Sequence, residues 1–246
     1  MTDTFVEDVS MNFACLSVQG PNSRNVLQKI TDTSLENSEF KFATGRYCKI
    51  AGVDVWIQKL SYVGELGWEI FISKSDAISV YKAIKNNGRE FNLCDVGLHA
   101  VNSLRLEKGY RHWGHDIAAE DNMFEAGLSF VAKTDGIDFI GKDAFLKQAI
   151  RSPKRKLVQF KLNDPDPMLY HNEPILMNGE VNGYITSGMY GHSLGCAVGM
   201  GYVNCENLTK EKLKQIDFEI EIATERYDAE ASLISLYDPD GSKMKL

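Results

Sequence analysis

Hydrophobic and polar positions along the first part of the chain follow two different periods. Apolar residues at every second position predict strands, which we place at Phe13–Val18, Arg46–Ile50, Val53–Leu60 and Trp68–Ile72. Ala51-Gly52 stands between two of these strands and is suited to a tight turn, so a β-hairpin is expected there. Helical spacing predicts helices at Asn22–Ile30, after Ser75 and at Gly97–Lys108. The mixture predicts α+β or α/β layers.

Two of these helices are expected to bury one face each. Ser75 is a candidate N-cap for the first, whose inward face would consist of Ala77, Ile78, Tyr81 and Ile84. The inward face of the second would consist of Leu98, Val101, Leu104 and Leu106. Gly109 stands where a C-cap glycine would end this second helix.

After a short helix expected at Gly141–Ile150, the period of the pattern changes to two. Arg151–Lys156 is polar, basic and contains proline, so it is the best candidate for a linker. Strands are expected around Val158, Phe160 and Leu162 and at Ile175–Met177, Glu180–Ile185, Phe218–Ala223 and Ala229–Leu236. Asn178-Gly179 joins two of them as a hairpin turn. Short strands with turn signals predict a small barrel or sandwich, so we divide the chain into residues 1–150 and 151–246.

Composition narrows the class of protein. The 246 residues include 43% hydrophobic and 25% charged residues, which is ordinary for a globular chain with a core. A net charge of −7 argues against nucleic acid as the main partner. No apolar run reaches the roughly 18 residues that span a bilayer, and the N-terminus lacks the features of a secretory signal, so no membrane partner is expected. Five cysteines without a CxxC spacing indicate reduced thiols and a cytoplasmic protein.

The connection Ser61–Glu69 is the first candidate ligand site. Its sequence, SYVGELGWE, combines two glycines with Glu65 and Glu69 between two expected strands. A carboxylate at a strand start can accept two parallel hydrogen bonds from an amidine-like edge, such as that of a pterin, and Tyr62 could stack on the same ring. The alternative is an exposed turn with solvated acids.

Two further segments carry chemistry-bearing residues. Arg105 could pair with Glu107 or Asp116 at a helix end and approach an anionic ligand. His112 and His115 invite a metal interpretation, but HxxH followed by one aspartate matches no zinc signature, and structural hydrogen bonds are the commoner role.

The glycine-rich stretch Ser187–Gly201 has neither of the usual phosphate-binding patterns. Glycines at barrel bends explain it better. Cys196 and His192 could form a nucleophilic pair, but no third partner is visible.

Several motifs resemble one known family. "SYVGELGWEI", "GLHAVNSLRLEKGYRHWGHDI" and "NMFEAGLSF" are similar to the aminomethyltransferase (T-protein) family of the glycine cleavage system, as are "LSVQGPNSRNVLQKIT", "PILMNGEVNGYITSG" and "VGMGYV" in the same order. The resemblance extends from about Phe13 to the C-terminus. The segments "LRLEKGYRHWGHDI", "FIGKDAFLKQ" and "NGEVNGY" most resemble the C-terminal folate-binding portion of sarcosine and dimethylglycine dehydrogenases.

This resemblance implies a fold, a cofactor and two site residues. The fold is an incomplete folate-binding T-protein domain with a ferredoxin-like α/β layer at 1–150, followed by an antiparallel β-barrel at 151–246. The implied chemistry is one-carbon transfer to tetrahydrofolate, forming 5,10-methylenetetrahydrofolate, with FAD only on a separate dehydrogenase domain or chain. Tyr62 and Glu69 match the tyrosine and glutamate with which the family contacts the pterin.

Two departures from the family pattern qualify the expected activity. Val101 stands where the glycine-cleavage enzymes have a substrate-binding arginine, and the amine-dehydrogenase relatives tend to be apolar there. The family's catalytic aspartate lies upstream of "QGP", and neither Asp3 nor Asp8 has a matching context. We therefore assign no catalytic residue, and expect a truncated product, an excised fragment, or a chain that relies on another polypeptide for its upstream half. Whether the isolated chain is an enzyme stays open.

Alternative functions belong to other classes. One is a folate-dependent methyltransferase acting on a sulfonium donor, and another is a non-catalytic folate-binding scaffold. The iron–sulfur assembly relatives carry a "KGCYxGQE"-like motif, whereas this chain reads "EKGYRHWGHD". The mitochondrial matrix would be the location in a eukaryote.

Overall fold

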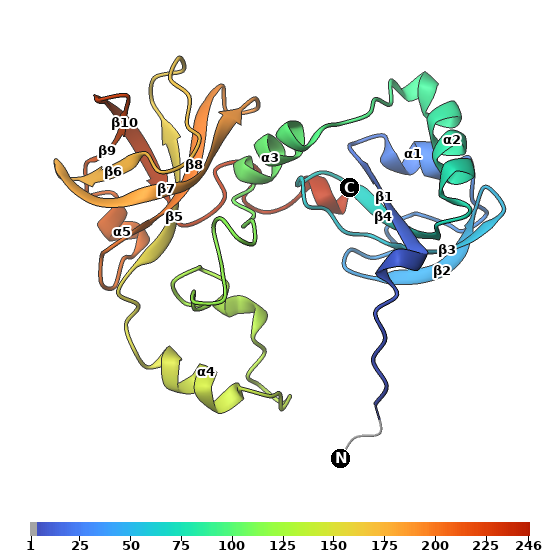
Figure 1. Ribbon diagram of the computed structural model, residues 1–246, viewed down its shortest axis with the longest axis horizontal. Helices are drawn as coiled ribbons and strands as arrows, with labels where there is room; N and C mark the ends of the chain where they lie inside the picture. The colour runs from blue at the N-terminus through green and yellow to red at the C-terminus, as the bar shows by residue number, and fades with distance from the viewer. Residues whose placement is uncertain (1–3) are drawn as a thin grey trace. The chain divides into compact units, whose positions relative to one another are not determined.

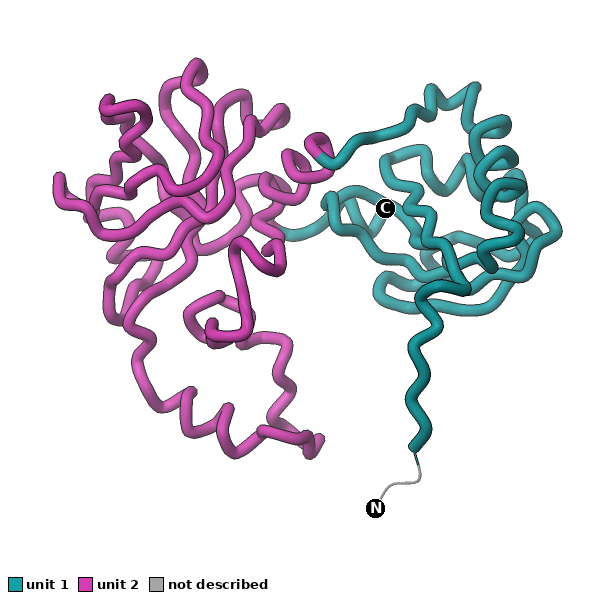
Figure 2. The backbone as a smooth tube through the Cα atoms, in the orientation of Figure 1, with its two compact units in different colours: residues 1–98, 240–246 teal, residues 99–239 magenta. Residues whose placement is uncertain are grey.

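The computed structural model describes residues 4–246, which divide into two compact units (Figures 1 and 2). One unit comprises the chain up to Leu98 together with Asp240–Leu246, and the other comprises His99–Pro239. These compact units do not test the predicted domain boundary at residue 150, which stays a prediction.

The first unit is built on a four-stranded antiparallel sheet in the order β1-β4-β3-β2. Its strands are β1 (Phe13–Gln19), β2 (Gly45–Ile50), β3 (Val53–Gln58) and β4 (Gly67–Ser73). Its helices are α1 (Ser23–Gln28) and α2 (Ala77–Gly88), with 3₁₀ turns at Ser10–Asn12, Arg89–Phe91 and Lys243–Lys245. The strands lie where the alternation predicts them, because a half-buried strand must alternate apolar and polar residues.

One face of this sheet carries the core. Trp68, Ile70 and Ile72 of β4 are fully buried and belong to one hydrophobic cluster with Val80 and Ile84 of α2. The alternate residues of the same strands lie on the opposite face, which neither α1 nor α2 covers in Figure 1.

The prediction for α2 was wrong in its cap and in part of its inward face. Asp76 precedes the helix without a side-chain cap, and the Ser75 hydroxyl donates to the Asp76 carboxylate instead. Ile84 is buried as expected, but Ile78 is exposed and Val80 takes the inward position. Tyr81, also exposed, donates its hydroxyl to the carboxylate of Asp95. The helix begins at Ala77, one residue later than the Ser75 cap implies.

Both predicted hairpin turns are confirmed by backbone angles. Ala51 and Gly52 have φ of 51° and 81°, and Asn178 and Gly179 have φ of 53° and 85°. Two consecutive positive φ angles define the turn whose twist matches that of paired strands. Glycine at the second position accepts this conformation without a Cβ clash.

The second unit contains a closed antiparallel barrel of six strands in the order β10-β5-β8-β7-β6-β9. Its strands are β5 (Lys156–Leu162), β6 (Pro174–Met177), β7 (Glu180–Gly191), β8 (Cys196–Val203), β9 (Phe218–Ile222) and β10 (Glu225–Ser232). The helices are α3 (Leu98–Glu107), α4 (Lys142–Ala149) and α5 (Lys210–Leu213), with a 3₁₀ turn at Ser129–Val131. Of the two architectures that the pattern allowed, the structure forms the barrel.

Strand β8 is buried along its whole length because both of its faces are covered. Ala197 and Val203 belong to the cluster inside the barrel. Val198 and Met200 belong to a second cluster on the outer face, where Leu106 of α3 packs against the barrel. A strand buried on both faces cannot show alternation, so its glycine-rich sequence gave no period.

The glycines of β8 are therefore packing positions. Gly195 lies in the β7–β8 turn with φ of 74°, as the bend interpretation predicts. Gly199 and Gly201 lie inside the strand, beside a register shift in β7 between Ile185 and Ser187. A Cβ on Gly201 would stand 2.4 Å from the Tyr184 carbonyl oxygen and 2.6 Å from Ile175 Cδ1.

Gly201→Ala should lower the free energy of unfolding of the barrel by about 1–3 kcal/mol, because the added methyl group meets a backbone oxygen. Gly97→Ala is the matched control, since a Cβ there meets nothing within 4 Å. Urea unfolding measures both variants. Equal midpoints would contradict the close-packing explanation.

The prediction for the inward face of α3 was wrong for Leu98 and right for Leu106. Leu98 is 81% exposed, whereas Arg105, Leu106 and Glu107 are buried. Gly109, with φ of 63°, ends the helix as expected, and the Tyr110 N–H donates to the Arg105 carbonyl. The buried end of α3 therefore carries charged side chains, which the barrel must satisfy.

Candidate functional site

Glu69 lies in the middle of β4 on the sheet face opposite the core. In the register of the sheet it stands between Ser17 of β1 and Gln58 of β3. Gln58 Nε2 donates to Glu69 Oε2 at 2.8 Å, and Trp56 Nε1 donates to Gln58 Oε1 at 3.4 Å. This relay orients the half-buried carboxylate. Its second oxygen, Oε1, accepts no hydrogen bond from any residue between 4 and 246, so it keeps its acceptor capacity.

Tyr62 lies in the loop that connects β3 to β4, and 38% of its surface is exposed. The loop is anchored at its far end, because the Gly20 N–H and the Ser23 hydroxyl both donate to the Leu66 carbonyl, at 2.8 and 3.0 Å. Gly67 is required where the loop enters β4, since a Cβ there would stand 2.7 Å from the Val18 carbonyl oxygen. The structure thus places both predicted site residues on one anchored loop–strand segment.

An aromatic groove of about 670 Å³ continues along the same face of the sheet. It is lined by Tyr47, Trp56, Phe71 and Cys15 together with the segment Glu7–Ser10. The rings of Tyr47 and Trp56 meet edge to face, with centroids 5.0 Å apart. Sequence reasoning missed Trp56 and Gln58. The alternation of Val53–Leu60 puts them on one face, but only the pairing of β3 with β4 brings that face to Glu69.

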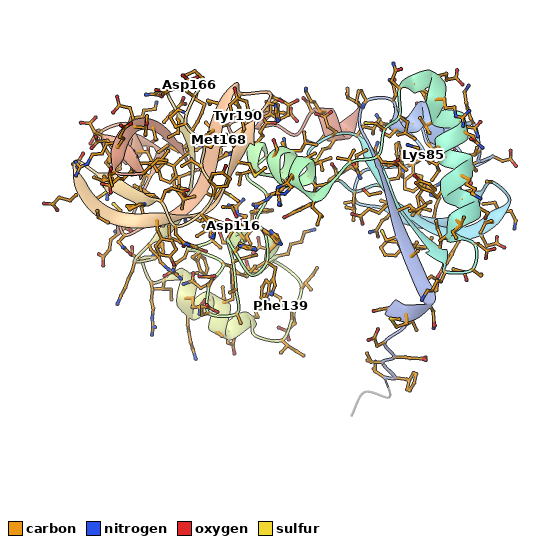
Figure 3. All side chains as sticks on the ribbon, turned by 45° about the horizontal axis from the view of Figure 1, so that its top comes forward. Lys85, Asp116, Phe139, Asp166, Met168 and Tyr190 are labelled. Atoms are coloured by element: carbon orange, nitrogen blue, oxygen red, sulfur yellow. The ribbon has the colours of Figure 1, made fainter. Side chains whose placement is uncertain are left out.

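Arg105 pairs with Asp116, which settles one of the alternatives left by the sequence. Arg105 Nη1 lies 2.6 Å from Asp116 Oδ2, and both side chains are almost fully buried. Asp116 Oδ2 also accepts from the His112 N–H at 2.8 Å, and its Oδ1 accepts from Thr186 Oγ1 at 2.6 Å. The carboxylate therefore ties α3 and the loop after it to strand β7 (Figure 3, where Asp116 is labelled).

Glu107, the other possible partner of Arg105, accepts hydrogen bonds from the barrel instead. Its Oε1 accepts from the N–H groups of Ser193 and Leu194 at 2.7 and 3.0 Å, which closes the β7–β8 turn. Cys196 is buried beside this turn, and burial raises the pKa of its thiol. His192 is exposed and contacts the ring of Tyr190. A raised pKa opposes thiolate formation, so the Cys196–His192 nucleophile has no support.

His112 and His115 lie next to each other after α3, with ring centroids 4.6 Å apart. No group of three or more potential metal-binding side chains was found within residues 4–246. His112 donates its backbone N–H to Asp116, in line with the structural role that the sequence favoured.

Three residues were considered for the family's upstream acid and for its substrate-binding arginine, namely Asp3, Asp8 and Val101. Asp3 lies outside the described residues. Asp8 accepts the Ser10 N–H at 2.9 Å and borders the aromatic groove. Val101 is half-buried on α3. The absence of a catalytic acid stays a prediction.

Comparison with known proteins gives consistent similarities along the chain. The family model described as the GCVT N-terminal domain matches residues 1–136, and that of the glycine cleavage T-protein C-terminal barrel domain matches residues 155–238. Mitochondrial sarcosine dehydrogenase of Homo sapiens is 35% identical over 242 residues, which are 97% of this chain and 26% of that protein.

The aminomethyltransferase of Halothermothrix orenii is 40% identical over 207 residues, which are 84% of this chain and 57% of that protein. The crystal structure of glycine cleavage system aminomethyltransferase T from Bartonella henselae superimposes with a TM-score of 0.73 at 27% identity, over 89% of this chain and 58% of that one. The chain thus spans between a quarter and three fifths of these relatives. No helix within residues 4–246 is long and apolar enough to cross a membrane.

Proposed function

Because the chain belongs to the glycine cleavage T-protein family, we propose that it binds tetrahydrofolate and takes part in one-carbon transfer. The similarity to sarcosine dehydrogenase favours an amine-demethylating system, in which 5,10-methylenetetrahydrofolate is formed. Tetrahydrofolate supplies the nitrogen atoms that accept the one-carbon unit. A FAD-dependent dehydrogenase domain or chain is the proposed partner, since oxidation of the N-methyl amine requires an electron acceptor.

The observation that carries the proposal is that the Glu69 carboxylate is oriented by one hydrogen bond and can accept further ones. Gln58 holds Oε2 from one side, and Oε1 is left with acceptor capacity on a sheet face that also carries an aromatic groove. The pterin ring presents an N–H and an amino group side by side, and a carboxylate accepts both in parallel. These residues therefore fit the group. Tyr62, on the loop into the same strand, is the proposed second contact.

Glu69→Ala should weaken tetrahydrofolate binding by at least about tenfold, because both parallel hydrogen bonds are lost. Titration calorimetry measures the dissociation constants. Glu90→Ala is a matched control, since it removes an exposed carboxylate that pairs with Lys29 in the same unit and does not line the groove. Glu69→Gln keeps the shape but exchanges one acceptor for a donor, so it should also bind weakly. Equal affinities for wild type and Glu69→Ala would overturn the assignment.

A second experiment separates transfer from scaffolding. The chain is mixed with tetrahydrofolate, an N-methyl amine and a FAD-dependent amine dehydrogenase. Formation of 5,10-methylenetetrahydrofolate above the rate without the chain supports transfer. Binding without any increase favours the scaffold alternative. A sulfonium donor in place of the amine tests the methyltransferase alternative. The cytoplasmic or mitochondrial location and the division at residue 150 stay predictions.

A further inference from the structure

The second unit contains a small cavity of its own. It has a volume of about 150 Å³ and lies between the end of α3, the loop that follows it, the loop before β6 and strand β7. The polar side chains that line it include Asn102, Arg105, His112, His115, His171 and Ser187. None of its lining residues is an aspartate or glutamate. The cavity is therefore lined by hydrogen-bond donors and basic side chains, with no acidic side chain among them.

Arg105 lines this cavity and has a side-chain donor without a partner. A guanidinium has five N–H groups. Three are engaged, with Asp116 Oδ2 at 2.6 Å, the Tyr110 carbonyl at 3.0 Å and Ser187 Oγ at 2.9 Å. The buried Nε–H has no acceptor anywhere in residues 4–246. A buried polar group without a partner is rare, and it commonly marks the place of a bound water, ion or ligand.

The nearby carboxylate of Asp116 does not occupy these donors. Its two oxygens already accept from Arg105 Nη1, the His112 N–H and Thr186 Oγ1. Asp116 is fully buried behind Arg105 and does not line the cavity. The free edge of the guanidinium, which includes Nε, is of the kind that binds a carboxylate side-on.

The histidines add a second source of donors. His112 is half-buried, whereas His115 and His171 are exposed at the rim. Burial, together with the positive charges of Arg105 and His115, lowers the pKa of His112. An environment that disfavours added positive charge is one that an anion would stabilise.

We propose that this cavity binds a small carboxylate, held by Arg105 with His112 and His171. Its volume is below the roughly 300 Å³ of sites that enclose whole drug-sized ligands, so it suits a short amino acid or one end of a longer molecule. Two sources supply this group. One is an N-methyl amino acid such as sarcosine, and the other is the glutamyl end of a folate. The site itself does not depend on folate binding, because acetate alone tests it.

The five histidines of the chain allow a direct test. Three line the cavity, and His99 and His192 lie elsewhere as internal controls. In an NMR titration with acetate, the imidazole resonances of His112, His115 and His171 should shift and saturate, and those of the two controls should not. Acetamide, the neutral isostere, should shift none of them. Shifts in all five histidines, or in none, would overturn the proposal.

Variants and competition identify the source of the carboxylate. His171→Ala should weaken acetate binding by about fivefold or more, while the exposed His99→Ala leaves it unchanged; equal binding by all three proteins would overturn the role of His171. Displacement of acetate by sarcosine supports the amino acid as the ligand. Displacement by tetrahydrofolate, but not by tetrahydropteroate, which lacks the glutamate, supports the glutamyl end. If neither displaces acetate, the cavity holds an adventitious ion only and the proposal fails.

Discussion

Asp116→Ala is expected to lower the free energy of unfolding of the barrel unit by about 3–5 kcal/mol, the usual cost of removing one partner from a buried ion pair. The substitution leaves Arg105 as an uncompensated charge in the protein interior, because both side chains are almost fully buried. It also removes the acceptor of the His112 N–H and of Thr186 Oγ1. Three donors lose an acceptor through one change, so the effect should be among the largest of any single substitution.

Most of this loss of stability is expected to come from the unpaired guanidinium of Arg105. A double variant that removes both charges tests this. Arg105→Met combined with Asp116→Leu removes both charges and should recover much of the stability, because apolar residues of similar size replace a buried pair at little cost. Glu230→Ala, which breaks the exposed pair with Lys161, should cost less than about 1 kcal/mol. Urea unfolding followed by hydrogen exchange in residues 99–239 provides the values. A small loss for Asp116→Ala, equal to that for Glu230→Ala, would contradict the interpretation.

Trp68→Ala should destabilise the first unit by about 3–5 kcal/mol, because it removes the largest fully buried side chain and leaves a cavity. The ring packs edge to face against Phe40, with centroids 6.4 Å apart. The ammonium group of the buried Lys59 lies 5.5 Å from the ring centre, and burial lowers the pKa of Lys59. Loss of the indole therefore also removes a favourable contact for a charge that is already desolvated.

The matched control for Trp68→Ala is Tyr47→Ala on the opposite face of the same sheet. Tyr47 is 82% exposed, so its removal should change the free energy of unfolding by only about 0.5 kcal/mol. Hydrogen exchange of β1, β3 and β4 reports on this unit separately from the barrel. Comparable losses for the two aromatic residues would show that the core does not lie on the face that carries Trp68.

The candidate ligand segment was predictable in its residues and less so in its surroundings. The motif around Tyr62 and Glu69 is local, and the sequence located both on one loop and strand. The orienting partner Gln58 lies 11 positions away along the chain. Its contact depends on the register of β3 against β4, which periodicity alone does not specify.

At the C-terminal end of α3, the hydrophobic pattern did not predict which side chains are buried. Of the residues that helical spacing favoured as inward, Leu106 is buried but Leu98 is exposed. The helix also buries Arg105 and Glu107. Their partners Ser187, Ser193 and Leu194 come from the barrel, more than 80 positions later. A charged residue is buried only where such partners exist. No window of the sequence contains both ends of these interactions.

Local sequence was enough to predict the strands other than β8, the two hairpin turns, the change of period before the barrel and the family resemblance that the comparisons confirm. These features depend on neighbours within a few residues, where side-chain alternation and backbone angles are set. Only the folded structure shows which apolar faces are buried, that Arg105 pairs with Asp116, and that Arg105 and three histidines line one cavity. Those outcomes depend on distances between segments far apart in the chain, and a linear pattern carries no distances.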